Sequence, residues 1–193
     1  TDPEKNKELY FEEKFLRTGD LGFLDEDGYL RITGRAKDLI IRGGHNIDPA
    51  IAEEALASHP SVAMVGVIGQ PDARAGEMPC AYVELIKGSE VPTEELIKHV
   101  EKNIGEKAAI PKHFDIVDEM PKTPIGKIFK PELRKRAIKR VYNEALEKSE
   151  ISARVQEVIE HPNKGLTAVV AKNGVNDAKQ IGKVLDKFIF SWE

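Results

Sequence analysis

The stretch DLIIRGGHNIDP, residues 38–49, is where the sequence changes from antiparallel strands to an alternation of strands and helices. Its apolar segment, Leu39–Ile41, reads as a strand and is followed by the adjacent glycines Gly43-Gly44. Asp48 and Pro49 are the residue types of a helix N-cap and of a first helical position. We therefore predict a strand, a two-glycine turn and a helix in this order, which begins a domain of the α+β class.

The apolar pattern beyond residue 49 predicts a small mixed sheet flanked by helices. One helix is capped by Thr93 and a second opens at Pro131, because apolar residues follow each at helical spacing. Strands are expected at Val62–Ile68, Cys80–Ile86 and Phe114–Val117. The helical faces expected in the core are Leu96, Ile97, Val100 and Ile104 in the first helix, and Leu133, Ala137, Ile138 and Val141 in the second.

The first 34 residues read as a short antiparallel β meander, with strands at 15–18, 21–24 and 29–32. The acidic stretch DEDG, residues 25–28, lacks the ligand spacing of a calcium loop and is interpreted as a hairpin turn. A meander of this size is only marginally stable alone. We therefore interpret residues 1–34 as the last strands of a preceding domain.

The stretch after Ser149 predicts a β-β-α-β extension. Strand patterns occur at Arg154–Ile159 and Leu166–Ala171, and a helix pattern occurs at Asp177–Leu185. In the last segment, Phe188–Trp192, aromatic residues alternate with Ile189 and Ser191. A half-buried strand requires this period of two, so we predict a fourth element there.

The composition is that of a globular protein. Of the 193 residues, 40% are hydrophobic and 32% are charged, which excludes a disordered tail, a collagen-like fibre and a coiled-coil rod. No apolar run approaches the ~20 residues of a membrane span. The single cysteine and the lack of a leader pattern in the first residues favour a cytoplasmic location.

The net charge of −4 hides a basic segment, residues 127–140, with seven basic residues and one acidic residue. A solvated helix face is the usual explanation of such a segment. An anion-binding site is the functional alternative.

Four short segments each have a feature that folding alone does not require. TGD, residues 18–20, ends a strand with a carboxylate suited to a ribose diol, and GRAKD, residues 34–38, is a charged linker. RGGHNI, residues 42–47, places two glycines between a strand and a helix, where backbone can approach a ligand closely. Taken alone, the first is better explained as a strand-ending turn and the second as a linker, whereas a tight turn explains the third equally well. PKTPIGK, residues 121–127, is stiffened by two prolines and ends in a lysine made mobile by the glycine before it.

In this order and register, the four segments resemble the adenylate-forming superfamily, which includes acyl-CoA synthetases, peptide-synthetase adenylation domains and luciferases. The resemblance covers residues 14 to about 140, and GGHNI (43–47) and GKIFKP (126–131) are most similar to bacterial acyl-CoA synthetases. The resemblance implies that the chain has four parts. Residues 1–34 are the terminal strands of an N-terminal adenylation domain, and residues 35–37 are a hinge. Residues 38–148 are a C-terminal lid domain, and residues 149–193 are an extension beyond the part that most members of the superfamily share.

The resemblance also implies roles for residues outside the lysine loop. Asp20 and Arg35 match residues that hold the ribose hydroxyls of the nucleotide. Lys37 occupies the hinge position about which the lid rotates. Gly43 and Gly44 match the loop that lines the pantetheine channel in the second orientation of the lid.

Lys127 matches the lysine that reaches the substrate carboxylate and the α-phosphate during adenylation. In the implied reaction, a small-molecule carboxylic acid and ATP form an acyl-adenylate, which coenzyme A converts to a thioester. The implied cofactors are ATP/AMP, coenzyme A and Mg²⁺, with the Mg²⁺ bound mainly by the N-terminal domain, which is also the implied partner. We expect no metal site, no nucleic-acid partner and no membrane span in this chain, and no turnover by this chain alone.

Two other functions stay open. An adenylation domain that transfers its acyl group to a carrier protein is one, although no Gly-rich segment with a carrier serine follows Lys127. A non-catalytic module that binds nucleic acid through the basic helix, residues 134–140, is the other. Under the ligase interpretation, Lys130, Arg134 and Lys135 are instead candidates to attract the phosphates of coenzyme A.

Three residues near these motifs receive only structural interpretations. Asn46 stands where some relatives have an arginine that touches the nucleotide phosphate, and asparagine cannot supply that charge. His45 is interpreted as a packing or turn residue. Cys80 falls in a predicted core strand and is interpreted as a small buried hydrophobe.

Overall fold

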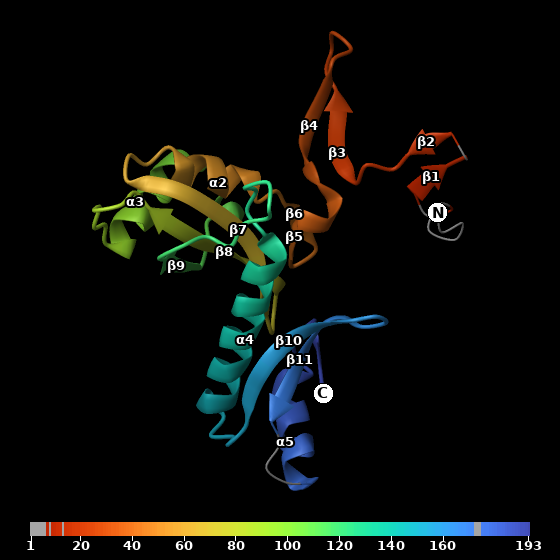
Figure 1. The fold of residues 1–193 in the computed structure, drawn as a ribbon, viewed down its shortest axis with the longest axis vertical. Helices are drawn as coiled ribbons and strands as arrows, with labels where there is room; N and C mark the ends of the chain where they lie inside the picture. Colours follow the sequence, from red (N-terminus) through yellow and green to blue (C-terminus); the bar gives the residue numbers. More distant parts are fainter. Residues whose placement is uncertain (1–6, 8, 13, 172–174) are drawn as a thin grey trace. The chain divides into compact units, whose positions relative to one another are not determined.

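The chain divides into two compact units, Thr1–Leu39 and Ile40–Glu193. The computed structural model describes residues 7, 9–12, 14–171 and 175–193, and the side chains of all of these except 175–177. Figure 1 shows the elements of both units in chain order.

The first unit consists of two antiparallel strand pairs. β1 (Tyr10–Phe11) pairs with β2 (Phe15–Leu16), and β3 (Asp20–Leu24) pairs with β4 (Leu30–Arg35). The 3₁₀ helix η1 (Ala36–Asp38) follows. Both Asp25 oxygens hold the β3–β4 turn, because Oδ1 accepts the Tyr29 N–H at 2.8 Å and Oδ2 accepts the Arg31 Nε–H at 2.8 Å. The predicted antiparallel strands and hairpin turn are therefore confirmed, but β2 pairs with β1 and not with β3, so the strands form two separate pairs in place of one meander.

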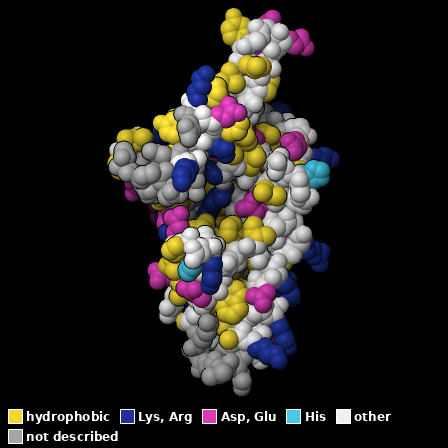
Figure 2. Space-filling model, turned by 90° about the vertical axis from the view of Figure 1, so that its right-hand side faces the viewer, with side chains coloured by type: hydrophobic (Ala, Val, Ile, Leu, Met, Phe, Trp, Pro, Cys, Tyr) yellow, Lys and Arg dark blue, Asp and Glu magenta, His cyan; other side chains and the backbone are white. Residues whose placement is uncertain are grey.

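The β3–β4 hairpin has no core of its own. None of the residues described in this first unit is buried. Its apolar side chains lie at the surface, as Figure 2 shows for the hydrophobic side chains drawn in yellow, and the most exposed are Phe23, Leu24, Tyr29, Leu30 and Ile32. Exposed apolar side chains gathered on one hairpin are typical of a surface that contacts other protein.

The second unit begins with a mixed five-stranded sheet. β7 (Val62–Asp72) and β8 (Gly76–Leu85) form a long antiparallel hairpin, and β9 (His113–Val117) pairs with β8 in parallel. β5 (Ile40–Arg42) joins β8 where Arg42 pairs with Gly76, and β6 (His45–Ile47) pairs with β5. The sheet and its flanking helices confirm the predicted α+β class.

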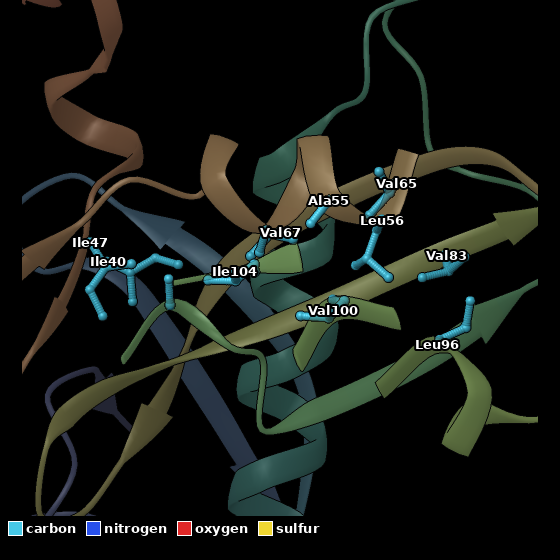
Figure 3. Packing of buried hydrophobic residues seen from close by; sticks show 13 residues of the cluster. Ile40, Ile47, Ala55, Leu56, Val65, Val67, Val83, Leu96, Val100 and Ile104 are labelled. Atoms are coloured by element: carbon cyan, nitrogen blue, oxygen red, sulfur yellow. The ribbon is translucent and has the colours of Figure 1, made fainter. Parts of the chain in front are cut away.

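Helices cover both faces of this sheet. α2 (Ala50–Ala57) and α3 (Thr93–Asn103) pack on the face that carries Val65, Val67 and Val83, and Figure 3 shows this core. The 3₁₀ helix η2 (Lys107–Ala109) adds to the same core. Ile68, Cys80 and Tyr82 alternate with those residues along the strands and point to the other face, where they pack against the first half of α4 (Lys130–Lys148).

The extension is built onto the second half of α4. β10 (Arg154–His161) and β11 (Gly165–Ala171) are antiparallel, α5 (Val175–Leu185) follows, and β12 (Ser191–Trp192) pairs with β11 in parallel. The predicted β-β-α-β order is confirmed. Residues of α4 belong to this second core as well, namely Ile138, Tyr142 and Leu146. One helix of 19 residues therefore connects the core of the sheet with the core of the extension.

Several expected boundaries differ from the structure. Thr93 is the first residue of α3 and not its cap, because Pro92 takes the cap position. The last strand is Ser191–Trp192 and not Phe188–Trp192, because Phe188 continues the end of α5 through its N–H bond to Leu185 O at 3.0 Å. The first helix starts at Ala50, and Pro49 takes the cap position. Asp48 still acts as expected, since its Oδ1 accepts the Ala50 N–H at 2.9 Å.

Candidate functional site

Asp20 and Arg35 lie opposite each other on β3 and β4. Arg35 Nε is 3.2 Å from Asp20 Oδ1, and the two side chains are 55% and 33% exposed. The turn before Asp20 is fixed by Gly19 at φ +78° and by Thr18 Oγ1, which accepts the Asp20 N–H at 3.1 Å. The strand register thus brings two predicted site residues into one accessible ion pair.

Lys37 lies at the junction of the two units. It is an exposed residue of η1, and the boundary between the units falls after Leu39. Residues in a short connecting segment are the ones that can absorb a change of backbone angles in a hinge motion.

The Gly43-Gly44 pair forms a hairpin turn between two strands, and the expectation of a strand-to-helix loop was wrong. Arg42 and His45 are paired across the turn, and both glycines have positive φ, +57° and +85°. Two positive values are the signature of a type I′ turn, which matches the twist of a hairpin. The Gly43 N–H donates to Ala75 O at 2.7 Å, which ties the turn to the start of β8.

We expect Gly44→Ala to lower the free energy of unfolding of the chain by about 1–2 kcal/mol. There is open space around a Cβ at this position, so the cost arises from the left-handed backbone alone. Gly105→Ala is the matched control, because that glycine also faces open space but does not have a positive φ. Urea unfolding of both variants checks this, and equal midpoints would contradict the type I′ turn.

Lys127 lies on a tight hairpin, residues 121–129, which we call the Lys127 hairpin. Lys122 and Ile128 form an antiparallel bridge, and the Thr123 N–H donates to Lys127 O at 2.7 Å. The Gly126 N–H donates to Thr123 O at 2.8 Å, and Gly126 has φ +80°. This is a three-residue turn with glycine at its left-handed position.

The backbone of Lys127 is held on both sides. Its N–H donates to Thr123 Oγ1 at 3.1 Å, and its carbonyl accepts from Thr123 N–H. Gly126 thus closes the turn and does not loosen it. The mobility expected of Lys127 is therefore limited to its side chain. Lys127 is exposed, and within the described ranges its ammonium group has no ion pair or hydrogen bond.

Most of the basic segment is engaged inside the second unit. Lys130 Nζ lies 2.8 Å from Glu53 Oε1, and Arg136 Nε lies 3.5 Å from Glu132 Oε1. Lys139 Nζ donates to Gln156 O in β10 at 2.5 Å. Arg140 donates to Gln70 Oε1 at 2.6 Å and lies 3.2 Å from Glu144. The contacts of Arg140 with Gln70 and of Lys139 with Gln156 tie α4 to the sheet and to the extension, and that of Lys130 ties it to α2. They favour the structural interpretation of the segment.

The remaining candidates have no arrangement that supports catalysis. Cys80 is fully buried, and desolvation raises the pKa of its thiol to about 12, so it stays a protonated thiol at neutral pH. His45 and Asn46 are exposed residues of β6, and His45 closes the glycine turn by pairing with Arg42. In the described part of the chain, His, Cys, Asp and Glu side chains form no group of three that is able to hold a metal ion. No helix there is both long enough and apolar enough to cross a membrane.

Glu53 and Glu84, which lie at the base of the Lys127 hairpin, were not predicted from the sequence. Glu84 Oε2 accepts the Met120 N–H at 2.7 Å and lies 3.5 Å from Lys122 Nζ. Their partners are distant along the chain, and an acidic residue in a helix or strand carries no local signal of such a contact.

The stretch from α2 to the Lys127 hairpin is the part of the chain that matches a known family. Residues 52–127 match the family described as the AMP-binding enzyme C-terminal domain. The chain belongs to the adenylate-forming family, as the similarities to particular proteins also show.

The marinolic acid–CoA ligase of Pseudoalteromonas sp. (strain SANK 73390) is 41% identical over 194 residues, which cover 97% of this chain and 30% of the ligase. Among solved structures, ATP-bound MatB from Rhodopseudomonas palustris is 37% identical with a TM-score of 0.62, over 68% of this chain and 26% of that one. The o-succinylbenzoate CoA synthetase MenE from Bacillus subtilis, solved with the acyl-adenylate intermediate OSB-AMP, is 38% identical with a TM-score of 0.61. This match covers 66% of this chain and 26% of MenE.

The chain thus spans between a quarter and a third of the length of these relatives. The alignment with the marinolic acid ligase covers nearly the whole chain and therefore takes in most of the extension. The matches to the two solved structures each cover about two thirds of this chain.

Proposed function

We propose that this chain supplies the lid of an ATP-dependent acid–thiol ligase. In the first half-reaction a carboxylate oxygen attacks the α-phosphate of ATP, which gives an acyl-adenylate and pyrophosphate. In the second, the thiol of coenzyme A attacks the acyl carbon, and AMP leaves. The observation that carries this proposal is an exposed lysine without an ion partner, Lys127, on a rigid hairpin of an AMP-binding C-terminal domain.

Lys127 is proposed to act in the first half-reaction. The attack brings a carboxylate anion to a phosphate anion, and a cation between them lowers their repulsion and stabilises the charge that develops in the transition state. Two unit charges ~4 Å apart interact by about 4 kcal/mol at an effective dielectric constant of 20. The fixed backbone of the hairpin reduces the entropy that the side chain must lose to reach this position.

Asp20 and Arg35 are proposed to hold the ribose of the nucleotide. A carboxylate accepts hydrogen bonds from both hydroxyls of a vicinal diol, and Arg35 is close enough to hold the Asp20 carboxylate in one orientation. Both side chains are accessible, so the ion pair is able to receive a ligand without unfolding the hairpin.

Gly43, Gly44 and Lys37 are proposed to act in the second half-reaction. A turn of two glycines presents backbone without side chains, so a thin pantetheine arm is able to pass along it. The lysine needed for adenylation blocks the approach of the thiol while it occupies the site. Rotation about the segment around Lys37 would withdraw Lys127 and bring the glycine turn to the acyl-adenylate.

The other ligands are assigned to a larger, N-terminal domain. ATP, the carboxylic acid and Mg²⁺ need a pocket that includes metal-binding carboxylates, and the described residues bring no such group together. The exposed apolar faces of the β3–β4 hairpin are suited to pack against that domain. A fatty-acid substrate and a cytoplasmic location stay predictions.

Coenzyme A is favoured over a carrier protein as acyl acceptor, because relatives of this chain are CoA ligases. Nucleic-acid binding by the basic helix is disfavoured, because most of its basic side chains already have partners.

We expect this 193-residue chain alone to produce no AMP or acyl-CoA from ATP, a fatty acid and coenzyme A. The reason is that the acyl pocket and most of the nucleotide pocket are assigned to the N-terminal domain. Chromatographic measurement of AMP over hours, with an intact ligase as the positive control, checks this. Turnover by the isolated chain would contradict the division of functions proposed here.

A further inference from the structure

We propose that Glu53 and Lys130 form a positioning pair that holds the Lys127 hairpin in the shape required for adenylation. This inference rests on the proposed role of Lys127 and assigns two further residues to the same step. Neither residue is proposed to touch the substrates.

The first observation is the ion pair between Lys130 and Glu53. Lys130 is the first residue of α4 and directly follows the hairpin, and its Nζ lies 2.8 Å from Glu53 Oε1. The side chains are only 20% and 23% exposed, so water screens this ion pair less than an open surface pair. The same Oε1 atom accepts the N–H of Val67 at 2.7 Å. Glu53 therefore joins α2, β7 and the start of α4 at one point.

The opposite strand of the hairpin is anchored in the same manner. Glu84, in β8, binds the Met120 N–H at 2.7 Å and lies 3.5 Å from Lys122 Nζ. Each end of the hairpin thus meets a carboxylate that is itself held by the core of the second unit.

Packing beneath the hairpin completes the arrangement. A Cβ added to Gly66 in β7 would lie 3.2 Å from Ile128 Cγ2 and 2.8 Å from Leu133 Cδ1. The absence of a side chain at Gly66 therefore allows the end of the hairpin and the first turn of α4 to lie directly on β7. With both ends tied and the base packed, we infer that side-chain rotations of Lys127 are the main freedom of its ammonium group relative to the rest of the second unit.

A competing role for Lys130 is attraction of coenzyme A phosphates. The two roles predict opposite kinetic results. A positioning residue changes the rate of the step that uses Lys127, whereas a phosphate-binding residue raises the KM for coenzyme A.

The test uses the intact ligase with Lys130→Met, which removes the charge but keeps a long aliphatic side chain and leaves Glu53 bound to Val67. We expect single-turnover adenylation to slow about tenfold, because small displacements of a catalytic group lower the rate strongly. The KM for coenzyme A and the rate of thioester formation from supplied acyl-adenylate are expected to stay within about twofold. Lys98→Met is the matched control, since Lys98 is an exposed lysine of α3 without a partner in the described ranges.

Two further variants show whether the pair is the cause. Lys130→Arg keeps the charge and is expected to recover most of the rate. Glu53→Gln keeps an oxygen for the Val67 N–H and removes the charge, so it should slow adenylation as Lys130→Met does, and the double variant should add no further loss. Unchanged adenylation in Lys130→Met, equal losses in both half-reactions, or a raised KM for coenzyme A would each overturn the proposal.

Hydrogen exchange on the 193-residue chain gives a result that does not depend on catalysis. The Phe129 N–H donates to Pro121 O at 2.7 Å across the hairpin. We expect this amide to exchange at least about tenfold faster in Lys130→Met, while the Val83 amide in the core sheet keeps its rate. Unchanged exchange at Phe129 would also overturn the proposal.

The Lys127→Ala variant, measured in the same kinetic assays, separates the positioning pair from the proposed function. Normal adenylation by Lys127→Ala would refute the proposed function. Slow adenylation by Lys127→Ala together with normal adenylation by Lys130→Met would refute only the positioning pair.

Discussion

Replacing Lys127 by alanine in the intact ligase is expected to slow acyl-adenylate formation by up to about a thousandfold, while thioester formation from supplied acyl-adenylate is retained. The reason is that the lysine cation acts only where two anions meet, and about 4 kcal/mol of interaction corresponds to a factor of this size. Pyrophosphate release in a single turnover measures the first step, and conversion of synthetic acyl-adenylate to acyl-CoA measures the second.

Two controls accompany this prediction. Lys127→Arg keeps a cation on a side chain of similar length and should retain a larger part of the rate, whereas Lys98→Ala removes an exposed lysine of α3 and should have no effect. Equal loss in both half-reactions for Lys127→Ala would contradict the separation of the two steps, because it would indicate a general structural defect.

Replacing Tyr142 by alanine is expected to lower the free energy of unfolding of the chain by about 3–5 kcal/mol. The residue is fully buried where α4 meets the extension, and its ring centroid lies 5.0 Å from that of Phe188. Its hydroxyl donates to Phe190 O at 2.6 Å, and burial raises its pKa. Tyr142→Phe removes only this hydrogen bond and should cost about 1 kcal/mol.

Two probes of urea unfolding test whether the extension and the sheet unfold together. Trp192 is the single tryptophan and lies in the extension, so its fluorescence reports on that part, whereas far-UV circular dichroism reports on the whole chain. Because α4 belongs to both cores, we expect the two midpoints to shift together in Tyr142→Ala. A fluorescence transition that moves alone would show that the extension is an independent domain.

The sequence was sufficient to predict the elements whose burial follows a regular period. The apolar stripe from Leu133 to Val141 predicted α4, and the order of strands and helix in the extension was also correct. The resemblance singled out Asp20 and Arg35 separately, and their ion pair became visible only with the register of β3 and β4.

Other features depended on contacts between distant residues. β6 has only three residues, too few to show a period, and it forms because Ile47 and Ile40 pair across the glycine turn. The alternation of Phe188, Phe190 and Trp192 correctly predicted burial against the extension core, but burial does not require strand pairing. Nothing in the neighbourhood of Glu53 indicated its contact with Lys130.

The most direct test of the proposed role of Lys127 is chemical rescue of a Lys127→Cys ligase with bromoethylamine, which converts the thiol to a thioether that carries an ammonium group at nearly the position of lysine. Cys80 does not need to be replaced, because it is fully buried and its thiol has a pKa raised to about 12. Other exposed cysteines of the ligase are replaced first. We predict that Lys127→Cys loses adenylation and that alkylation restores it by at least about a hundredfold, whereas an alkylated ligase as slow as Lys127→Ala would contradict the role of the ammonium group.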